Sequence, residues 1–342
     1  MKELYIEAPG VVTFRDADMP VRKEGEAILK LLYGGLCGSD LGSYRGTFAY
    51  FEYPRIPGHE FSAEIVDIDE DNAYGLKKGM VVVCNPYFNC GKCYPCRTGH
   101  VNVCEHNETL GSQRDGAFRT YISMPLERIY YGKGLDPKLL ACVEPFCIGL
   151  HGVNHVELKK GDRVLVIGSG TIGIFAATAA KMKGATVVMA DIAEQKLEKA
   201  KRDFGIDGTI LNDSHENFMS LVMEKTDGCG FDVCIEAVGL PSTFQACIDA
   251  ACFGGSVILI GVGKKNLDFN FTMIQKKELR VYGSRNALKN DFLETIDAMA
   301  AGRLDLGNAI TDIYPFSEAP KAFAEFSAHQ GEKLKVLLDF SR

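Results

Sequence analysis

The chain has 342 residues, of which 46% are hydrophobic and 24% are charged. This length exceeds what one hydrophobic core usually serves, so two domains are expected. With 38 Lys and Arg residues against 45 Asp and Glu residues the net charge is −7, which argues against a nucleic-acid partner because such a partner requires a basic surface.

The start of the chain, MKELYIEAPG, lacks the apolar core of a signal peptide, and no apolar run is long enough to span a membrane. We therefore expect a cytoplasmic protein without a membrane partner. Twelve cysteines in such a chain are expected to be metal ligands or small buried hydrophobes rather than disulfides.

The first 150 residues are rich in predicted β-strands. The apolar runs LYIEA and EAILKLLY are broken by Gly and Pro, and AEIVDI, MVVVCNP and GAFRTYISMP also predict strands. The segment KLLACVEPFCIGLHGVNHV predicts a helix after Glu144-Pro145.

Four cysteines interrupt this β-rich unit with the spacing C-x2-C-x2-C-x7-C: Cys90, Cys93, Cys96 and Cys104. Four thiolates this close can surround one tetrahedral ion, and Zn²⁺ favours such closed sites. An iron–sulfur cluster is the alternative, but the bacterial ferredoxin run places its fourth Cys three residues on and before Pro, whereas Glu105 follows here. We predict a structural zinc lobe over residues 84–107, which leaves the chemistry to another site.

From residue 161 the pattern changes to alternating strands and helices. The buried strand RVLVIG is followed by a glycine-rich turn, an Ala-rich helix, TVVMAD and the charged helix AEQKLEKAKRDFG. The alternation continues through GTIL, ENFMSLVMEKT, FDVCIEAVG, STFQACIDAAC, GSVILIGVG and LRVYGS. It predicts an α/β fold with a doubly wound parallel Rossmann sheet.

After Ser284 the chain predicts the helices DFLETIDAMAAG and SEAPKAFAEF and the strand KVLLDF, which we expect to rejoin the first domain. The predicted domains are therefore 1–150 with 286–342, and 151–285.

A dinucleotide site is predicted where Gly168, Gly170 and Gly173 follow a strand and open a helix. The first glycine permits the tight turn, the second lets the backbone approach a pyrophosphate, and the third lets the helix pack on the strand. Asp191 ends the next strand, where it can bind ribose hydroxyls and would repel a 2′-phosphate; no Arg follows it directly, which favours NAD over NADP. Lys196 either braces the ribose or is a solvated helix residue. Further residues assigned to the cofactor are Thr171, Ile172, Gly261, Val262 and Arg285.

A second candidate metal site consists of a thiolate, an imidazole and two carboxylates beside Gly or Pro: Cys37, His59, Glu60 and Glu144. A catalytic zinc uses three protein ligands and leaves one position for water or substrate. These residues are far apart in the chain, so spacing alone leaves open whether they meet.

The motifs GLCGSD, PGHEF, EPFCIGLH and GSGTIG, together with the four-cysteine lobe, resemble zinc-containing medium-chain dehydrogenases over nearly the whole chain. GHE and EPF, with Glu144 where alcohol dehydrogenases often carry a Cys ligand, are similar to the polyol and L-threonine dehydrogenase branch. The stretch KKELRVYGSRNALKNDF resembles bacterial sugar-acid dehydrogenases of the L-galactonate 5-dehydrogenase kind.

The resemblance implies a GroES-like catalytic domain beside the Rossmann domain, and it implies roles for the candidate residues. Cys37 and His59 would bind a catalytic zinc with Glu60 as third ligand, while Glu144 would either bind directly or hold the zinc-bound water. Asp40 would hydrogen-bond the second nitrogen of His59. Relatives often carry a His five residues after the zinc Cys, where this chain has Gly42, so the proton relay beyond Ser39 stays open.

The implied reaction is reversible oxidation of a secondary alcohol in a sugar acid or polyol. Zinc lowers the pKa of the hydroxyl, Ser39 accepts its proton, and hydride passes to NAD. The alternative enzymatic functions are those of an L-threonine 3-dehydrogenase and of a sorbitol-type dehydrogenase. An NAD-sensing regulator would not need an open metal site, and a metal-free quinone reductase would lack both metal centres.

Aromatic residues of the loop SYRGTFAYFEYPR are expected to line the mouth of the substrate pocket: Tyr44, Phe48, Tyr50 and Phe51. The carboxylate of a sugar acid needs a cation, for which Arg45, Arg114 and Arg285 are candidates, although each can equally be a surface charge.

The remaining cysteines are assigned to packing: Cys84, Cys142, Cys147, Cys229, Cys234, Cys247 and Cys252. The family resemblance also implies a homodimer or homotetramer, with GSVILIGVG as the edge strand that pairs between subunits.

Overall fold

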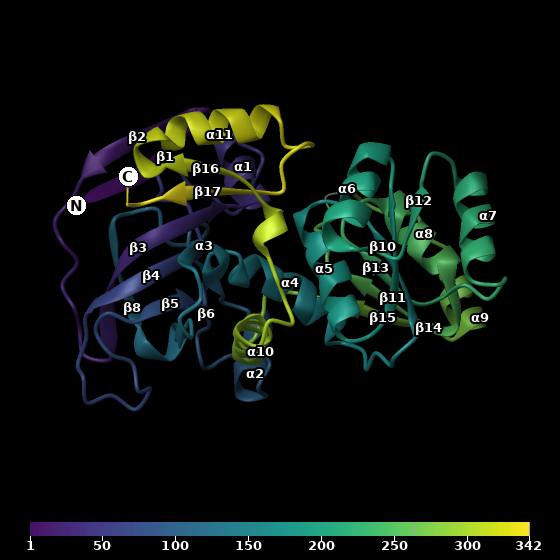
Figure 1. The fold of residues 1–342 in the computed structure, drawn as a ribbon, viewed down its shortest axis with the longest axis horizontal. Coiled ribbons are helices and arrows are strands. Elements are labelled where there is room, and N and C mark those ends of the chain that lie inside the picture. Colours follow the sequence, from purple (N-terminus) through teal and green to yellow (C-terminus); the bar gives the residue numbers. More distant parts are fainter. Residues whose placement is uncertain (264, 342) are drawn as a thin grey trace. The chain divides into compact units, whose positions relative to one another are not determined.

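The computed structural model describes residues 1–263 and 265–341. The chain divides into two compact units: unit 1 is Met1–Glu144 with Ala287–Arg342, and unit 2 is Pro145–Asn286. Both ends of the chain belong to unit 1 (Figure 1). Helix α4 (Val143–Val153) crosses the first boundary, which the sequence places after residue 150.

Unit 1 is built on a seven-stranded sheet with the order β16-β17-β3-β4-β5-β9, in which β8 also pairs with β3. The strands are β3 (Glu26–Leu36), β4 (Glu60–Asp67), β5 (Val81–Cys84), β8 (Tyr121–Pro125), β9 (Ile129–Tyr131), β16 (Ile310–Pro315) and β17 (Lys335–Asp339). Pairing is antiparallel except between β16 and β17. Because β17 pairs with β3, the C-terminal segment completes the sheet that the N-terminal segment begins.

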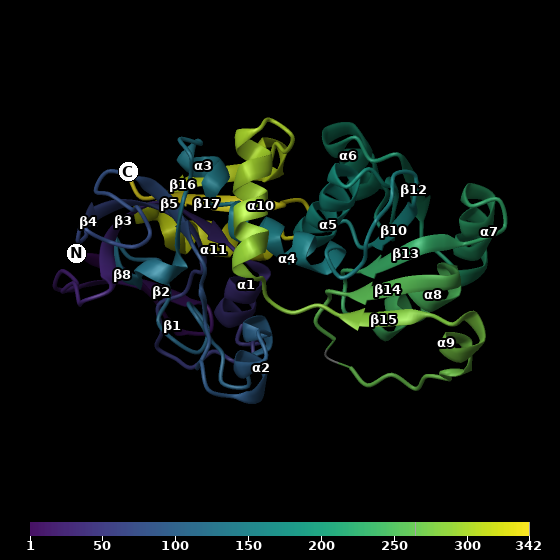
Figure 2. The same cartoon turned by 90° about the horizontal axis from the view of Figure 1, so that it is seen from below.

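Smaller elements complete unit 1 (Figure 2). Its remaining strands are β1 (Lys2–Ala8), β2 (Val11–Asp16), β6 (Tyr87–Phe88) and β7 (Glu108–Thr109). Its helices are α1 (Gly38–Tyr44), α2 (Tyr94–Arg97), α3 (Pro137–Leu140), α10 (Lys289–Ala300) and α11 (Ala319–Ala328), with 3-10 turns η1 (Val101–Val103), η2 (Leu126–Arg128), η3 (Gly307–Ala309) and η4 (Phe316–Glu318).

The core of unit 1 follows from the period of two in its strands. In β3, Ala27, Leu29 and Leu31 are buried in one apolar cluster, while Lys30 between them is exposed. A second cluster lies under α11, where Phe323 packs with Leu4 and Leu338. The unit therefore has a packed frame on both sides of β3, which carries the segment leading to Cys37.

Unit 2 has a six-stranded parallel sheet with the order β12-β11-β10-β13-β14-β15. Its strands are β10 (Arg163–Ile167), β11 (Thr186–Asp191), β12 (Gly208–Leu211), β13 (Phe231–Glu236), β14 (Ala251–Leu259) and β15 (Arg280–Gly283). Its helices are α5 (Thr171–Met182), α6 (Glu194–Phe204), α7 (His215–Lys225), α8 (Pro241–Ala250) and α9 (Thr272–Lys277).

The strand order reverses direction between β10 and β13. Right-handed crossovers therefore place the helices before the reversal, α5 and α6, on one face and the later α7 and α8 on the other. The predicted doubly wound sheet is confirmed. One detail is wrong: GSVILIGVG is not an edge strand, because β14 pairs with β13 on one side and β15 on the other.

Candidate functional site

Three of the candidate metal ligands meet at the end of β3 and the start of β4. Cys37 precedes α1 directly after β3, and the pairing register places Glu60 opposite Gly35. One ligand atom from each of Cys37, His59 and Glu60 lies within 4.8 Å of the others. Thiolate, imidazole and carboxylate are ligands that Zn²⁺ accepts, so this donor set fits a metal with an open position.

The glycine at position 35 makes room for this cluster. A Cβ on Gly35 would lie 2.3 Å from Oε2 of Glu60, a distance that no side chain tolerates. The sequence contains this signal in the Gly34-Gly35 pair of LLYGGLC, but only the strand register shows that Gly35 faces Glu60. The buried carboxylate of Glu60 in β4 therefore depends on Gly35 in the neighbouring strand β3.

Glu60 also forms a buried ion pair with Lys335, a residue that sequence reasoning missed. Lys335 Nζ lies 2.5 Å from Glu60 Oε2, and the two side chains are 3% and 1% exposed. Lys335 also donates to the carbonyl oxygen of Leu36 over 3.3 Å. Burial lowers the pKa of Lys335, but Glu60 and Cys37 raise it more, so it lies above its usual value.

Asp40 supports the cluster through backbone hydrogen bonds. Its carboxylate accepts hydrogen bonds from the backbone N–H of Cys37 over 2.9 Å and of Gly58 over 3.1 Å. The predicted hydrogen bond to the ring of His59 is not among these bonds and stays a prediction, while the charge of Asp40 raises the pKa of His59. Asp40 fixes the backbone next to two candidate ligands, since Gly58 precedes His59.

The electrostatics of the cluster suit a cation. Burial lowers the pKa of His59, but the nearby Cys37 and Asp40 raise it more, so it lies well above its usual value. An imidazole that holds its proton this strongly indicates an excess of negative charge around it. Ser39, the predicted proton acceptor, is half-buried in the first turn of α1.

Glu144 lies near the cluster without belonging to it. The three residues within 4.8 Å of one another do not include Glu144, and the hydroxyl of Tyr87 donates a hydrogen bond to its Oε1. Burial raises the pKa of Glu144 to about 7, against the opposing effect of His59. Tyr87 is a second residue that the sequence did not point to.

The four-cysteine lobe brings its sulfur atoms together as predicted, with one ligand atom from each residue within 4.8 Å of the others. Sγ of Cys93 lies 3.4 Å from Sγ of Cys96 and 3.7 Å from Sγ of Cys104. Zinc–sulfur bonds of about 2.3 Å in a tetrahedron require sulfur separations of about 3.8 Å, so the geometry fits a closed zinc site.

The surroundings of the four-cysteine lobe change the pKa of its thiols. Backbone N–H groups of Lys92 and Cys93 lower the pKa of Cys90 to about 6. Burial raises the pKa of Cys104 to about 11, although the N–H groups of Cys90 and His106 oppose it.

In unit 2 the glycine turn and Asp191 are joined directly. Oδ2 of Asp191 accepts hydrogen bonds of 2.7 Å from both the N–H and the hydroxyl of Ser169, and Oδ1 accepts one of 3.0 Å from the N–H of Ala193. Burial raises the pKa of Asp191, but these bonds lower it more, so it lies below its usual value. Gly168 has a φ of +104°, and a Cβ on Gly173 would lie 1.8 Å from the Gly168 carbonyl oxygen.

The other predicted cofactor residues lie at the carboxyl ends of the parallel strands or in the helices that follow. Thr171 and Ile172 open α5, Lys196 is half-buried in α6, Gly261 and Val262 follow β14, and Arg285 is exposed after β15. This edge of the sheet is where ligands of doubly wound folds bind.

The predicted pocket loop is largely structural. Phe51 is buried in the core, and Tyr44 and Phe48 pack against that core, while Tyr50 is 58% exposed. The expectation that Phe51 lines a pocket mouth is therefore wrong.

Two of the three candidate arginines have partners within unit 1. Arg45 donates to the hydroxyl of Ser327 and to Oε1 of Gln330, and Arg114 lies over the ring of Phe88 and 3.6 Å from Glu108.

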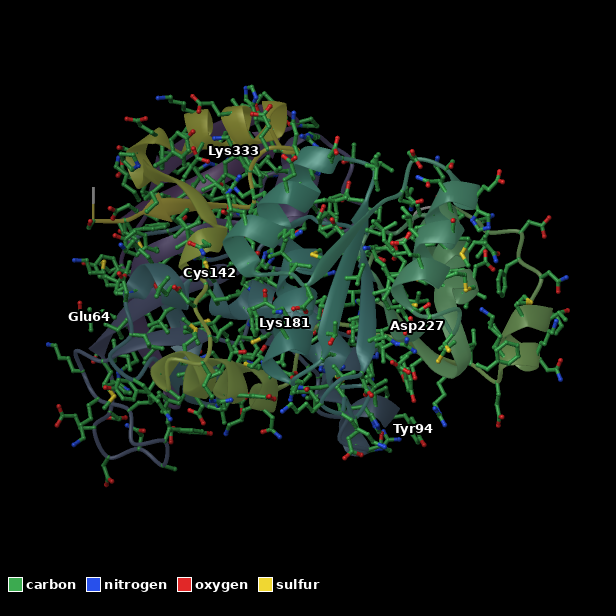
Figure 3. The ribbon with its side chains drawn as sticks, turned by 45° about the vertical axis from the view of Figure 1, so that its right-hand side comes forward. Glu64, Tyr94, Cys142, Lys181, Asp227 and Lys333 are labelled. Carbon is green, nitrogen blue, oxygen red and sulfur yellow. The ribbon has the colours of Figure 1, made fainter. Side chains whose placement is uncertain are left out.

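Most of the remaining cysteines are buried, among them Cys142, which is labelled in Figure 3. Cys252 is half-buried, and Cys229 is exposed beside Asp227, so the assignment of Cys229 to packing is wrong. Within the part of the chain that the structure describes, no two cysteines form a disulfide. No described helix has the length and apolar character needed to cross a membrane.

Comparison with known families gives two matches that together cover most of the chain. Residues 23–132 match the alcohol dehydrogenase GroES-like domain, and residues 171–301 match the zinc-binding dehydrogenase domain.

Comparison with individual proteins gives relatives of full length. The chain is 32% identical to L-galactonate-5-dehydrogenase of Escherichia coli K12 over 340 residues, which are 99% of each chain. It is 34% identical to sorbitol dehydrogenase of Halalkalibacterium halodurans over 346 residues, again 99% of each. The solved structure of a short chain alcohol dehydrogenase, RspB, of Escherichia coli CFT073 in complex with NADH superposes with a TM-score of 0.91 at 31% identity, covering 99% of each chain.

Proposed function

Because the chain belongs to the family of zinc-binding dehydrogenases with an alcohol dehydrogenase GroES-like domain, we propose that it oxidises a secondary alcohol of a sugar acid or polyol with NAD. The observation that carries the proposal is the meeting of Cys37, His59 and Glu60 within 4.8 Å in unit 1. Three such ligands match a catalytic rather than a closed zinc site, since the fourth position stays available for the substrate oxygen.

In the proposed reaction, each of these residues of unit 1 would have a separate role. A zinc ion held by Cys37, His59 and Glu60 would polarise the substrate hydroxyl, and the nicotinamide would accept hydride. Ser39 would accept the hydroxyl proton. Asp40 keeps the backbone of Cys37 and Gly58 in place, and Lys335 balances the charge of Glu60.

In unit 2 the glycine turn would bind the pyrophosphate at the N-terminus of α5. Asp191 would receive the ribose hydroxyls, and its negative charge supports NAD over NADP. Cys90, Cys93, Cys96 and Cys104 would hold a second, structural zinc.

The substrate class rests on two considerations. Full-length relatives act on L-galactonate and on sorbitol, according to their names. Of the candidate cations for a sugar acid, we propose Arg285 as the carboxylate partner, because it follows β15 at the carboxyl edge of the parallel sheet. We also propose that the enzyme acts in the cytoplasm as a dimer or tetramer.

The experiment is NADH formation, followed by absorbance, over a panel of hexonates, polyols and L-threonine, in parallel with enzyme stripped of labile zinc. Turnover of a hexonate or polyol that is lost on stripping and restored by zinc is the expected result. Preference for L-threonine would replace the proposed substrate class and leave the metal site intact. Activity that survives complete loss of labile zinc would refute the proposed mechanism.

The panel also tests Arg285. Replacing it with Met should lower kcat/KM for a hexonate more than tenfold, because a bidentate carboxylate contact is lost, and should leave a neutral polyol within about twofold. Equal losses on both substrates would show that Arg285 does not recognise a carboxylate.

A further inference from the structure

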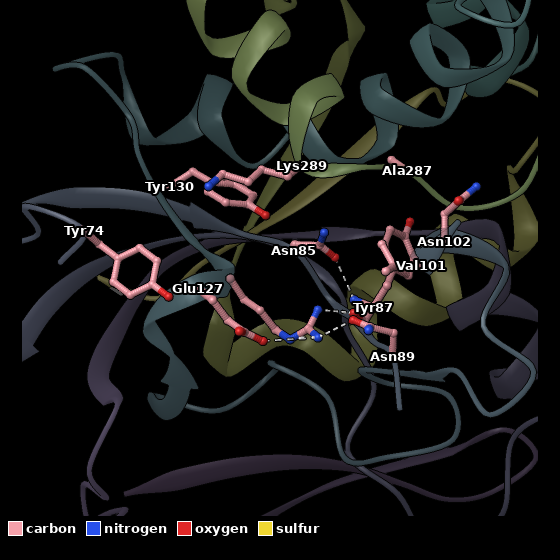
Figure 4. Close-up of a pocket in the computed structure, with 11 residues that line it drawn as sticks. Tyr74, Asn85, Tyr87, Asn89, Val101, Asn102, Glu127, Tyr130, Ala287 and Lys289 are labelled. Carbon is pink, nitrogen blue, oxygen red and sulfur yellow. Dashed lines mark hydrogen bonds and ion pairs between the residues drawn. The ribbon is translucent and has the colours of Figure 1, made fainter. Parts of the chain in front are cut away.

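Tyr87 is held at three points in unit 1. Its backbone N–H donates to Oδ1 of Asn85 over 2.9 Å, its carbonyl oxygen accepts from Nη1 of Arg128, and its hydroxyl donates to Oε1 of Glu144. Figure 4 shows Tyr87 beside Asn85 and Asn89 at the wall of a cavity of about 300 Å³. The first two bonds hold the backbone of Tyr87 in place, and the third holds its hydroxyl against Glu144.

The arginine that fixes this backbone also reaches the four-cysteine lobe. Nη2 of Arg128 donates to Oδ1 of Asn89 over 2.9 Å, and Nδ2 of Asn89 lies 3.7 Å from Sγ of Cys96. Arg128 is 8% exposed, so this bridge is made inside the protein. The backbone position of Tyr87 is therefore tied to the lobe as well as to β6.

Each of the two glutamates near the catalytic cluster has its own partner. Glu60, inside the cluster, is paired with Lys335, whereas Glu144, outside it, accepts from Tyr87. Glu144 is 4% exposed and Tyr87 7% exposed, so neither can exchange its partner for bulk water. A buried carboxylate that lost its donor would turn to the nearest cation.

We propose that Tyr87 is a positioning residue that holds Glu144 out of the metal's ligand set and so keeps the fourth position open for substrate. This inference rests on the proposed function and deepens it. Without the hydroxyl, Glu144 becomes a fourth protein ligand beside Cys37, His59 and Glu60, and the catalytic site becomes closed like the lobe.

The test replaces the labile zinc with Co²⁺ and records its visible d–d spectrum, with imidazole as a probe of the open position. In the wild-type enzyme imidazole should change the spectrum. In Tyr87→Phe the spectrum should differ before imidazole is added, the response to imidazole should be lost, and kcat should fall at least tenfold.

Two further variants make the result specific. Tyr314→Phe removes another tyrosine-to-glutamate hydrogen bond of unit 1, to Glu325, and should retain the wild-type spectrum and response. The double variant Tyr87→Phe/Glu144→Gln should recover the imidazole response, because an amide oxygen is a poorer zinc ligand than a carboxylate.

A spectrum and an imidazole response of Tyr87→Phe that equal those of the wild type would overturn the inference. So would weaker cobalt binding with the open position retained, since Tyr87 would then support a glutamate that is already bound. A wild-type enzyme that takes up no cobalt at this cluster would instead overturn the proposed function, and the inference with it.

Discussion

The ion pair between Lys335 and Glu60 is the most completely buried charge pair of the proposed site. Replacing Lys335 with Met should destabilise zinc-stripped protein by about 3–5 kcal/mol, because it leaves the Glu60 carboxylate buried without a partner. Denaturant unfolding measures this loss. Lys333→Met is the matched control: its partner Asp312 is 30% exposed, so its loss should be under about 1 kcal/mol.

The pH dependence of this pair follows from its pKa. The folded-state pKa of Lys335 is raised, so its stabilising effect is complete below the ordinary lysine pKa of about 10.4 and is lost as pH rises through the folded value. The difference between wild type and Lys335→Met should therefore not decrease as pH rises from about 6 to 9. A difference that decreases across that interval would contradict the assignment.

Asp191 has the opposite pH dependence. Its folded pKa is lowered, so its contribution is present above about pH 4 and is lost as pH falls through the folded value. Asp191→Asn should cost about 1–2 kcal/mol at pH 7 through weakened bonds to Ser169 and Ala193, and progressively less below pH 4. The same variant should reduce the preference for NAD over NADP, measured as the ratio of kcat/KM, because the charge that repels a 2′-phosphate is gone.

At the scale of single elements, Gly170 at the N-cap of α5 and Gly173 in the first turn of α5 have different roles. Gly173→Ala should destabilise the protein by about 1–3 kcal/mol, because its Cβ meets the Gly168 carbonyl oxygen at 1.8 Å and α5 must move. Gly170→Ala is the matched control, since its Cβ would meet nothing within 4 Å. It should lower the unfolding free energy less than Gly173→Ala does, through the weaker N-cap alone, and it should weaken NADH binding, which fluorescence titration measures. Equal stability losses in both variants would contradict this division.

The four-cysteine lobe should bind one of two zinc ions per chain. Cys104→Ser should lower the measured zinc content from two to one, because a closed site requires all four thiolates. Cys229→Ser, which changes an exposed cysteine outside the lobe, should leave the content at two.

Zinc uptake by the lobe should also release protons near pH 7. Cys90, with a pKa of about 6, is already largely ionised there, whereas Cys104, with a pKa of about 11, must lose its proton to bind the metal. Calorimetry in buffers of different ionisation enthalpy measures the release. Uptake without proton release would contradict the thiolate assignment.

At the scale of the whole molecule, the parallel sheet of unit 2 leaves β15 at its edge. Val281 in this strand is 38% exposed, and an edge strand offers unpaired backbone groups to a second copy. If subunits associate through β15, Val281→Lys should shift the mass measured by light scattering from oligomer to monomer at micromolar concentration, without loss of NADH binding. A wild-type chain that is monomeric under these conditions would refute the proposed oligomer.

The fold could be predicted in large part from local patterns. Continuous apolar runs separated by helical segments predict a parallel sheet in any context, because strands buried on both faces must be apolar. The sequence did not predict β16, whose polar and apolar residues alternate only weakly, or the short helix α9. It also placed GSVILIGVG at the sheet edge, because strand order depends on crossovers that leave no local signal.

For the candidate site, the sequence by itself determined the chemical inventory. The spacing of the four cysteines, the glycine turn with Asp191, and the presence of Cys37, His59 and Glu60 are local properties, and each predicts a ligand class from residue type alone. Their roles as ligands stay predictions until metal and cofactor are measured.

Only the tertiary structure decided which groups face these residues. Lys335 meets Glu60 because β17 pairs with β3 across about 300 residues of chain, and Tyr87 meets Glu144 across 57 residues. Asp40 likewise accepts from the backbone N–H of Gly58, which a local pattern does not predict, whereas its bond to Cys37 is a local helix cap. Burial and charge pairing arise from contacts between distant segments, so the sequence determines which ligands are available and the fold determines which of them a metal can reach.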